Sequence, residues 1–493
     1  MLRARRIPRL SRSISERRPT SISGRRASVS KRRASISKRR ASVSARFLAG
    51  ALAAAALTSA LQLRTGIAIA AAAPHRVSPG SGSSRWSRPF RIVSPVALDI
   101  LPAQIGFSAT GAAAIALGVH DADLPAVSAG FVVLRSARGR LGGLAPVPGA
   151  RSILDLSSDR SGLALLTGSS LAGALCCTSA QVIALTSAGS LSRATTVIGH
   201  LTGTVAGRVL ALNGGRTLAT ITSDSGVWAT QSSPAGRFAA PRRLTPAGDQ
   251  PKALAATVLS GGDRSAVAWT AGDTSGGSAP RRIFVATGSR LQAPRRGRAA
   301  VTVPAGHGVE ELGLVPRRGV ATAAWIESSY SSSGRYRSRT VVADLDHKPR
   351  AHPFTVTGED ASGLSVASGR HGDQALAWKT CGRSEKCTVR VACRPAGGRF
   401  GATRALGAID ASQTPVAAVA PNGAVLVGWI AGGRVLASGK RSANAAFDSP
   451  HAVSLGRYAH DLALRFGPRS EAIAAWTEGT LSPSLLGAVY PAA

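Results

Sequence analysis

The sequence repeats one short apolar strand that ends in tryptophan: AVAW (266–269), ATAAW (321–325), QALAW (374–378), VLVGW (425–429) and AIAAW (472–476). The tryptophans are 56, 53, 51 and 47 residues apart. Continuing this frame toward the N-terminus gives similar strands that end at Ile221, Leu166 and Leu117, at intervals of 48, 55 and 49. A period of about 50 residues without a helical pattern is typical of β-propeller blades.

The rest of each unit also has strand character. A shorter apolar strand and a turn with Gly or Asn precede the repeated strand, as in LNGG (212–215) and LSGG (259–262). An alternating strand follows it, as in RIFVATG (282–288), and then a fourth apolar segment. Hairpin turns between short alternating strands indicate antiparallel sheets. We therefore predict an all-β chain that forms an eight-bladed β-propeller of four-stranded blades.

The two ends of the repeat region complement each other. RPFRIVSP around Phe90 is an outermost strand without the strands that should precede it, and LLGAVY (485–490) lacks an outermost partner. We expect Arg91–Val93 to pair with Gly487–Val489 and to close the ring, which removes exposed sheet edges. Units two and three, which lack the tryptophan, are where a broken blade is expected first.

Over residues 85–493 this period and pattern resemble the secreted β-propeller repeat proteins of high-GC bacteria. The resemblance implies the fold and says little about activity. We expect the tryptophans to be buried between blades, where a large side chain fills the wedge, rather than to form a ligand-stacking set. The loops between the second and third strands should share one face.

Composition agrees with a folded β protein. The 493 residues are 44% hydrophobic and 17% charged, with 55 Gly and 27 Pro, which excludes a disordered chain and a helical bundle. The net charge is +37, but the strong preference of Arg over Lys also follows from GC-rich codons. The charge alone therefore does not identify a partner.

The N-terminal region divides by charge. Residues 1–46 hold 16 Lys or Arg against Glu16 alone and repeat RRASVSK-like units, which predicts a disordered basic tail. The apolar run 47–61 and the small residues up to 73 are typical of a signal peptide, followed by a linker (74–84) and the propeller (85–493). We expect a secreted or extracytoplasmic protein without a membrane span after cleavage. An organellar transit peptide, an uncleaved anchor and a nucleic-acid-binding arm remain alternatives.

The cysteines also bear on location. Cys381 and Cys387 flank a hairpin turn, so a disulfide across it is geometrically easy and would agree with export. The pairing of Cys393 and of Cys176-Cys177 stays open.

One loop has the chemistry of a binding site. The segment ESSYSSSGRYRSR (327–339) combines aromatic faces with positive charge, and its alternative interpretation is a flexible solvated loop. The candidate ligand-binding residues are Tyr330, Arg335, Tyr336, Arg337 and Arg339.

Motifs for catalysis are missing. The sequence has no G-x-S-x-G, H-E-x-x-H or C-x-x-C, so no catalytic, cofactor or metal residue is predicted. His120-Asp121-Ala122-Asp123 could meet a divalent cation, but a solvated loop explains it as well. Glu310-Glu311 and Glu359-Asp360 are adjacent pairs that point to opposite faces of a strand, although one residue from each pair could converge.

The expected function follows from location and charge. After cleavage at Ala73 the chain keeps 44 basic and 23 acidic residues, a net charge of +21. The main hypothesis is an exported, non-catalytic binding or scaffold protein for anionic polymers or another cell-surface protein. The alternative is a propeller enzyme, a glycosidase or lyase that acts on acidic polysaccharide. A basic-tailed nucleic-acid binder is the third hypothesis. Acids or histidines that converge in one place would favour the enzyme.

Overall fold

The computed structural model describes residues 86–94, 98–120, 128–158, 163–169, 179–185, 190–201, 206–246, 250–259, 262–272, 282–289, 292–294, 297–346, 351–354, 360–382, 386–480 and 482–491. The basic tail, the signal peptide and the linker of the sequence analysis lie outside these residues. None of the described residues belongs to a helix that is long and apolar enough to cross a membrane.

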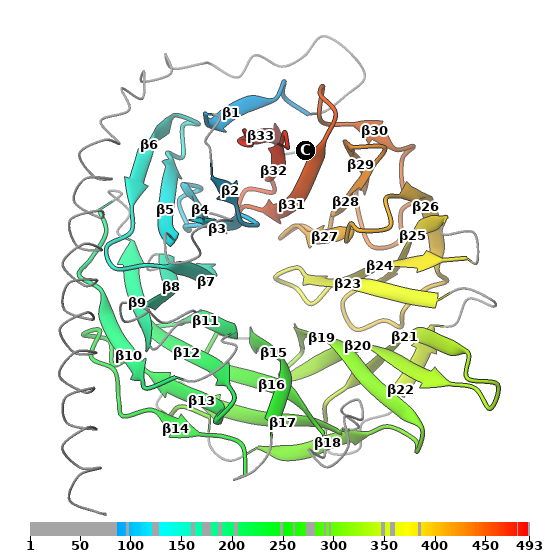
Figure 1. Ribbon diagram of the computed structural model, residues 1–493, viewed down its shortest axis with the longest axis horizontal. Helices are drawn as coiled ribbons and strands as arrows, with labels where there is room; N and C mark the ends of the chain where they lie inside the picture. Colours follow the sequence, from blue (N-terminus) through cyan, green and yellow to red (C-terminus); the bar gives the residue numbers. More distant parts are fainter. Residues whose placement is uncertain are drawn as a thin grey trace, which may run out of the picture. The chain divides into compact units, whose positions relative to one another are not determined.

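The described strands form eight antiparallel sheets around a common centre, which confirms the eight-bladed propeller (Figure 1). Blade 1 has an interrupted inner strand: β2 (Asp99–Ile100) and β3 (Gln104–Phe107) both pair with β4 (Ala113–His120), which is followed by β5 (Ser128–Arg135) and β6 (Leu141–Pro146). Blade 2 contains β7 (Ser152–Ser158), β8 (Leu163–Ser169), β9 (Ser179–Leu185) and β10 (Thr195–Gly199). Blade 3 contains β11 (Ala206–Leu212), β12 (Arg216–Ser223), β13 (Gly226–Gln231) and β14 (Arg242–Arg243). Blade 4 contains β15 (Gln250–Val258), β16 (Arg264–Gly272), β17 (Arg282–Ser289) and β18 (Arg298–Thr302).

The other four blades follow the same order from the centre outward. Blade 5 contains β19 (His307–Arg317), β20 (Val320–Tyr330), β21 (Tyr336–Asp344) and β22 (Ala351–Phe354). Blade 6 contains β23 (Asp360–Ser368), β24 (Gln374–Cys381), β25 (Cys387–Arg394) and β26 (Arg404–Ile409). Blade 7 contains β27 (Val416–Val419), β28 (Val425–Ala431), β29 (Arg434–Lys440) and β30 (His451–Ala452). Blade 8 contains β31 (Ala459–Phe466), β32 (Ala472–Glu478), β33 (Ser484–Tyr490) and, from the N-terminal side, β1 (Phe90–Val93).

The closure of the ring by both ends of the repeat region is confirmed, with a corrected register. Phe90 lies opposite Gly487, Arg91 opposite Leu486 and Val93 opposite Leu485, rather than opposite residues up to 489. An irregularity after Arg91 shifts the pairing, and a bulge of this kind leaves no signal in the strand pattern. Blades 2 and 3 are not broken, because each has four strands.

The repeated tryptophans are core residues, as predicted. Trp325 of blade 5 packs in one cluster with Ile283 and Val285 of blade 4. The other tryptophans likewise lie against the preceding blade. All five have no exposed surface: Trp269, Trp325, Trp378, Trp429 and Trp476. These side chains fill the space that widens between neighbouring sheets.

Blade 2 shifts this pattern by one residue. Leu165, rather than the predicted Leu166, packs against blade 1, whereas Leu166 faces blade 3. Alternate residues of a strand point to opposite faces, so a shift of one position reverses the side. With two adjacent leucines, the sequence pattern does not distinguish the two faces.

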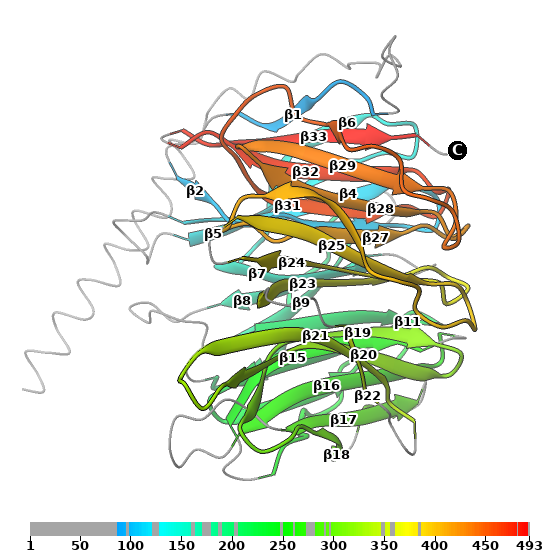
Figure 2. The ribbon, with the colours of Figure 1, turned by 90° about the vertical axis from the view of Figure 1, so that its right-hand side faces the viewer.

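Side chains of the inner strands tie blade 2 to blade 3 and blade 6 to blade 7. The Asp155 carboxylate accepts a hydrogen bond from the Val209 backbone N–H at 2.8 Å, and the Ser365 hydroxyl accepts one from the Ala417 N–H at 3.0 Å. These bonds join corresponding parts of successive inner strands, which therefore run in the same direction. The C-terminal ends of the second strands then lie on one face of the ring, here named the hairpin face, and Figure 2 gives the view from the side of the ring.

The predicted disulfide is present. Cys381 and Cys387 are bonded across the β24–β25 hairpin, with their Cα atoms 4.0 Å apart. Cys393 is a free, buried thiol, and Cys176-Cys177 lie outside the described residues. A structural disulfide is consistent with an extracellular location.

Removal of the Cys381–Cys387 disulfide should lower the free energy of unfolding by a modest amount. The cysteines are six residues apart, and a loop this short predicts a loss of about 2 kcal/mol for the double variant Cys381→Ser/Cys387→Ser. Urea unfolding of both proteins, with and without reductant, measures the change in the free energy of unfolding. Reductant should destabilise the wild type and leave the double variant unchanged, and an equal response of both would contradict this prediction.

Candidate functional site

The candidate binding loop is mostly strand. β20 extends to Tyr330 and β21 begins at Tyr336, so only residues 331–335 form the turn. Gly334 has a positive φ of 74° and donates its N–H to the Ser331 carbonyl, and the Ser331 N–H is bonded to the Arg335 carbonyl at 2.8 Å. Glycine adopts this backbone conformation without strain. Two paired strands therefore make up most of this segment of blade 5, and hydrogen bonds close the turn between them.

The pairing register places the candidate residues on the two sides of the hairpin. Tyr330 lies opposite Tyr336, and their rings make an edge-to-face contact with centroids 5.6 Å apart. Tyr330 is 71% exposed. Arg339 lies opposite Glu327, and Arg337 lies two residues away on the same side of the strand. The hairpin thus carries an exposed aromatic face at its tip and guanidinium groups along one side.

A histidine that the motif search missed completes this side. His307 Nδ1 is 2.7 Å from Glu327 Oε1, and Arg339 Nη2 donates to the same oxygen at 2.7 Å. The Glu327 side chain is only 4% exposed, whereas that of His307 is 29% exposed. A buried carboxylate therefore holds an imidazole at the hairpin face, and an arginine balances the charge of that carboxylate.

This arrangement determines which nitrogen of His307 is available. Glu327 Oε1 already accepts a hydrogen bond from Arg339, and we assign it as the acceptor from His307 Nδ1–H as well. Within the described part of the chain, His307 Nε2 has no hydrogen-bond partner. The lone pair of Nε2 can consequently accept a proton, as in sites where a carboxylate orients a histidine that acts as a base.

Tyr336 has a different role from His307. Its hydroxyl donates to the Glu310 carboxylate, 2.9 Å from each oxygen. Burial, this hydrogen bond and the charges of Glu310 and Asp360 raise the pKa of Tyr336, against a smaller opposing contribution from Ser338. Tyr336 therefore stays a phenol and positions Glu310 rather than acting as a base.

The described members of the adjacent acidic pairs, Glu310, Glu311 and Asp360, do not form a glycosidase pair. Glu311 accepts hydrogen bonds from the backbone N–H groups of Gly363 and Leu364, at 2.8 and 2.6 Å, and so ties blade 5 to blade 6. Asp360 accepts from the Ser338 N–H at 3.2 Å, and Glu359 lies outside the described residues. Glu310 and Asp360, one from each pair, do converge, but they converge around Tyr336.

The candidate metal cluster is only partly described. His120 ends β4, with Nε2 3.7 Å from Asp99 Oδ2, whereas Asp121–Asp123 lie outside the described residues. Among the residues that the structure describes, no group of three or more His, Cys, Asp or Glu side chains could hold a metal ion.

A second histidine–carboxylate pair lies on blade 8. His460 Nδ1 is 2.7 Å from Asp461 Oδ2, and Nε2 is 3.2 Å from the Gly479 carbonyl oxygen. The hydrogen bond to Asp461 raises the pKa of His460, burial opposes the rise, and Gly479 and the charges of Asp461 and Asp99 add to it. Both ring nitrogens are occupied, so this pair suits stabilisation better than proton transfer.

This pair should contribute pH-dependent stability. A folded-state pKa above the unfolded value favours the folded protein below the unfolded pKa of about 6.5, and the gain disappears as the pH rises through the folded pKa. His460→Gln should therefore reduce the free energy of unfolding at a pH of about 5.5 more than at about 8.5. Urea titrations of both proteins at the two pH values measure this, and an equal loss at both would contradict it.

Sequence reasoning missed His307 and Glu327, although one signal was present. Glu327 follows Trp325 by two residues and so shares its strand face, where blades 4 and 7 have Ala271 and Ala431. A carboxylate next to a core tryptophan needs a partner when it is buried. His307 lies 20 residues earlier, and only the folded sheet brings it to Glu327.

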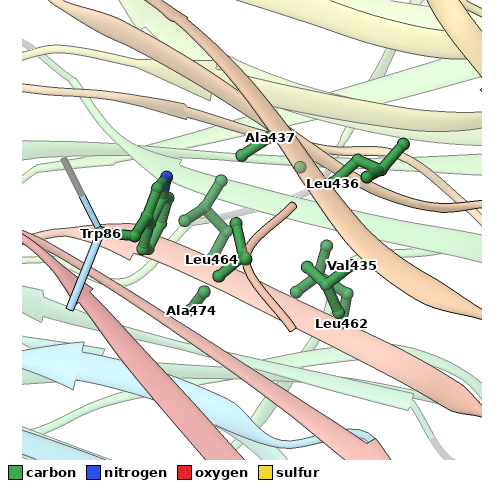
Figure 3. Close-up of a pocket in the computed structure, with 9 residues that line it drawn as sticks. Trp86, Val435, Leu436, Ala437, Leu462, Leu464 and Ala474 are labelled. Atoms are coloured by element: carbon green, nitrogen blue, oxygen red, sulfur yellow. The ribbon is translucent and has the colours of Figure 1, made fainter. Parts of the chain in front are cut away.

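The pocket of Figure 3 is an unsuitable ligand site. It lies between blades 7 and 8, is lined almost wholly by apolar side chains such as Trp86, Val435 and Leu464, and has no room for a water molecule. Trp86 also makes an edge-to-face contact with Tyr490, with ring centroids 5.3 Å apart. This pocket is part of the packing that closes the ring.

Comparisons with known proteins identify no family for this chain. No protein-family model matches the sequence, and no curated protein matches it. Among solved structures, the polysaccharide lyase Uly1 is 7% identical with a TM-score of 0.45, over 80% of this chain and 99% of that one. An ulvan lyase of family PL25, solved bound to GlcA(1-4)Rha3S, is 9% identical with a TM-score of 0.44, over 74% and 96%. A prolyl endopeptidase structure is 14% identical with a TM-score of 0.41, over 69% of this chain and 47% of that one.

These comparisons correct the main functional hypothesis. The expectation of a non-catalytic binding or scaffold protein is corrected: the similar solved structures include polysaccharide lyases and a prolyl endopeptidase. The propeller therefore gives no reason to exclude catalysis. The similarity does not decide which reaction takes place.

Proposed function

We propose that this protein is a propeller enzyme that cleaves an acidic polysaccharide by β-elimination, with His307 as the base. The observation that carries the proposal is the contact of 2.7 Å between His307 Nδ1 and the buried Glu327, which leaves Nε2 available at the hairpin face. Arg337 and Arg339 lie on the same side of the hairpin as His307, whereas Tyr330 lies on the other side. A base beside positive charge suits an acidic sugar.

The reaction removes the proton next to the carboxylate of a uronic acid. The C5–H bond breaks and its proton goes to His307 Nε2, while its electron pair forms the double bond between C4 and C5. The bond between C4 and the glycosidic oxygen breaks, and that oxygen leaves with the bonding electrons and takes up a proton. The His307 imidazolium can return its proton to this oxygen when both groups lie on one side of the ring.

Positive charge near the base lowers the barrier. Proton removal at C5 places negative charge on the sugar carboxylate, and a guanidinium can neutralise it with two parallel hydrogen bonds. Arg337 lies on the same side of β21 as Arg339, and we assign the carboxylate to these two residues. Tyr330, at the tip of the hairpin and on its other side, is the surface on which a more distant sugar ring packs. Arg335, in the turn, is a further positive charge for the polymer.

The arrangement favours a lyase over a glycosidase. A glycosidase needs two carboxyl groups that face each other across the sugar bond. The carboxylates at this site are already engaged: Glu311 with two backbone N–H groups, Glu310 with Tyr336, and Glu327 with His307 and Arg339. An imidazole base needs no second carboxylate beside the substrate.

We also propose that the enzyme acts outside the cell, after export through the N-terminal signal peptide. The Cys381–Cys387 disulfide is consistent with that location. The net charge of +21 after cleavage at Ala73 would attract anionic polymers. Acidic polysaccharide is the partner that this location and charge favour.

Product analysis tests the proposal. The protein is incubated with polygalacturonate, alginate and hyaluronan, and both new reducing ends and ultraviolet absorbance of the product are followed. Elimination yields a conjugated double bond, so absorbance should rise in step with reducing ends on at least one polymer. New reducing ends without absorbance would indicate hydrolysis and would contradict the proposed reaction.

A further inference from the structure

A polar pocket lies away from blade 5, between the outer parts of blades 3 and 4. Its volume is about 390 Å³, within the size range of small-molecule sites. Arg216, at the start of β12, and Gln231, at the end of β13, contribute to its lining. The β12–β13 hairpin lies at the other end of these strands, so this pocket opens on the face opposite to His307. It is named here the blade 3 pocket.

The charged side chains that line the blade 3 pocket are all positive. Arg216, Arg237 and Arg242 line it, and no Asp or Glu does. None of the ion pairs between described residues involves these three arginines. Arg216 Nε is buried without a hydrogen-bond partner among the described residues. Unbalanced guanidinium groups around a cavity favour a ligand with a carboxylate or sulfate group.

The remaining lining suits a sugar. The side chains of Gln231 and Gln292 offer amide groups, and Ser233 offers a hydroxyl, all of which can bind sugar hydroxyls. Phe238 is half-buried and contributes an aromatic surface, which can pack against the apolar side of a sugar ring.

The wall of this pocket is already ordered. The turn after β13 is closed by hydrogen bonds of Ser233 N–H to the Arg237 carbonyl and of Gly236 N–H to the Ser233 carbonyl, at 2.8 and 3.0 Å. The Thr217 N–H donates to the Ser232 hydroxyl at 2.8 Å and joins this turn to β12. The binding of a ligand therefore costs little ordering entropy.

We propose that the blade 3 pocket is a second ligand site, which binds a single sugar unit that carries a carboxylate or a sulfate. Arg216 and Arg242 contact the anionic group, and Phe238 contacts the ring. The site is independent of the proposed β-elimination, because it lies on the opposite face and shares no residue with the His307 site.

Ligand-observed NMR and calorimetry with the full chain test this proposal. The probes are glucuronate, glucose 6-sulfate, neutral glucose and inorganic sulfate. Both acidic sugars should bind the wild type more tightly than glucose, which lacks the charge, and than sulfate, which lacks the ring. Arg216→Gln and Arg242→Gln should each weaken acidic-sugar binding by about tenfold or more, because each removes a charged hydrogen-bond donor.

Two control variants test whether binding depends on the blade 3 pocket itself. Arg404→Gln removes an exposed arginine from β26, the outermost strand of blade 6, and should leave binding unchanged. His307→Gln should also leave it unchanged, so a failure of the proposed lyase activity would not affect this test. Arg242 is exposed, so Arg242→Gln should fold even if Arg216→Gln does not. Equal binding of glucose and glucuronate, or of wild type and Arg242→Gln, would overturn the proposal, as would sulfate binding as tight as that of glucuronate.

Discussion

His307→Gln should lower kcat for elimination by a factor of about 10²–10⁴, the usual contribution of a positioned base. Glutamine keeps a polar side chain that can reach Glu327, so the loss would come from the missing imidazole rather than from unfolding. The measurement is the rate of ultraviolet absorbance on the polymer that the wild type cleaves fastest. The free energy of unfolding, measured in urea, should change little.

Two comparisons make this result specific to the base. His371→Gln changes an exposed histidine in the turn before β24, on the face opposite to the hairpin face, and should keep wild-type activity. His307→Ala should regain part of its activity when imidazole is added to the solution, because a small base can enter the vacated space. Wild-type rates in His307→Gln would show that the base lies elsewhere.

The second large effect concerns stability. Trp429→Ala should lower the free energy of unfolding by about 3–5 kcal/mol, because it empties a large volume between blades 6 and 7. Trp429 has no exposed surface, and its indole N–H donates to the Ala408 carbonyl at 2.9 Å. Urea unfolding followed by circular dichroism measures the change.

Phenylalanine substitutions separate packing from hydrogen bonding. Trp429→Phe leaves the Ala408 carbonyl without its indole donor. The missing hydrogen bond should lower the free energy of unfolding by about 1 kcal/mol beyond the loss of packing. Trp325→Phe removes an equally buried indole whose Nε1 has no hydrogen-bond partner among the described residues. Trp325→Phe should therefore cost less than Trp429→Phe. The reverse order would contradict this assignment of the hydrogen bond.

Features with a local or periodic cause could be predicted from the sequence. The tryptophan strands recur because every blade must fill the same wedge. Five of them, with the spacing continued to Ile221, Leu166 and Leu117, predicted eight blades. The strands around Phe90 and Leu485 lacked partners in their own units, which predicted that they pair with each other. Cys381 and Cys387 flank a short turn, and their closeness depends on that hairpin alone.

Features that depend on register could not be predicted. The Val309 to Leu312 irregularity of β19 changes its pairing with β20 and decides how Glu310 and Glu311 are directed. Glu310 accepts a hydrogen bond from Tyr336, and Glu311 accepts one from the backbone of blade 6. Simple alternation along a strand predicts only that the two side chains point to opposite faces. The shift of one position between Leu165 and Leu166 has the same origin.

The sequence by itself determined the architecture: eight four-stranded blades, a ring closed by both ends, buried tryptophans and one hairpin disulfide. Periodicity and short-range geometry are sufficient for these, because each blade repeats the same packing problem. Only the tertiary structure decided the candidate sites. His307, Glu327 and Arg339 come from three strands, and the blade 3 pocket from two blades, so each depends on contacts between residues far apart in the chain. A one-residue slip in strand register would move every such side chain to the other face, and strand patterns do not carry that information.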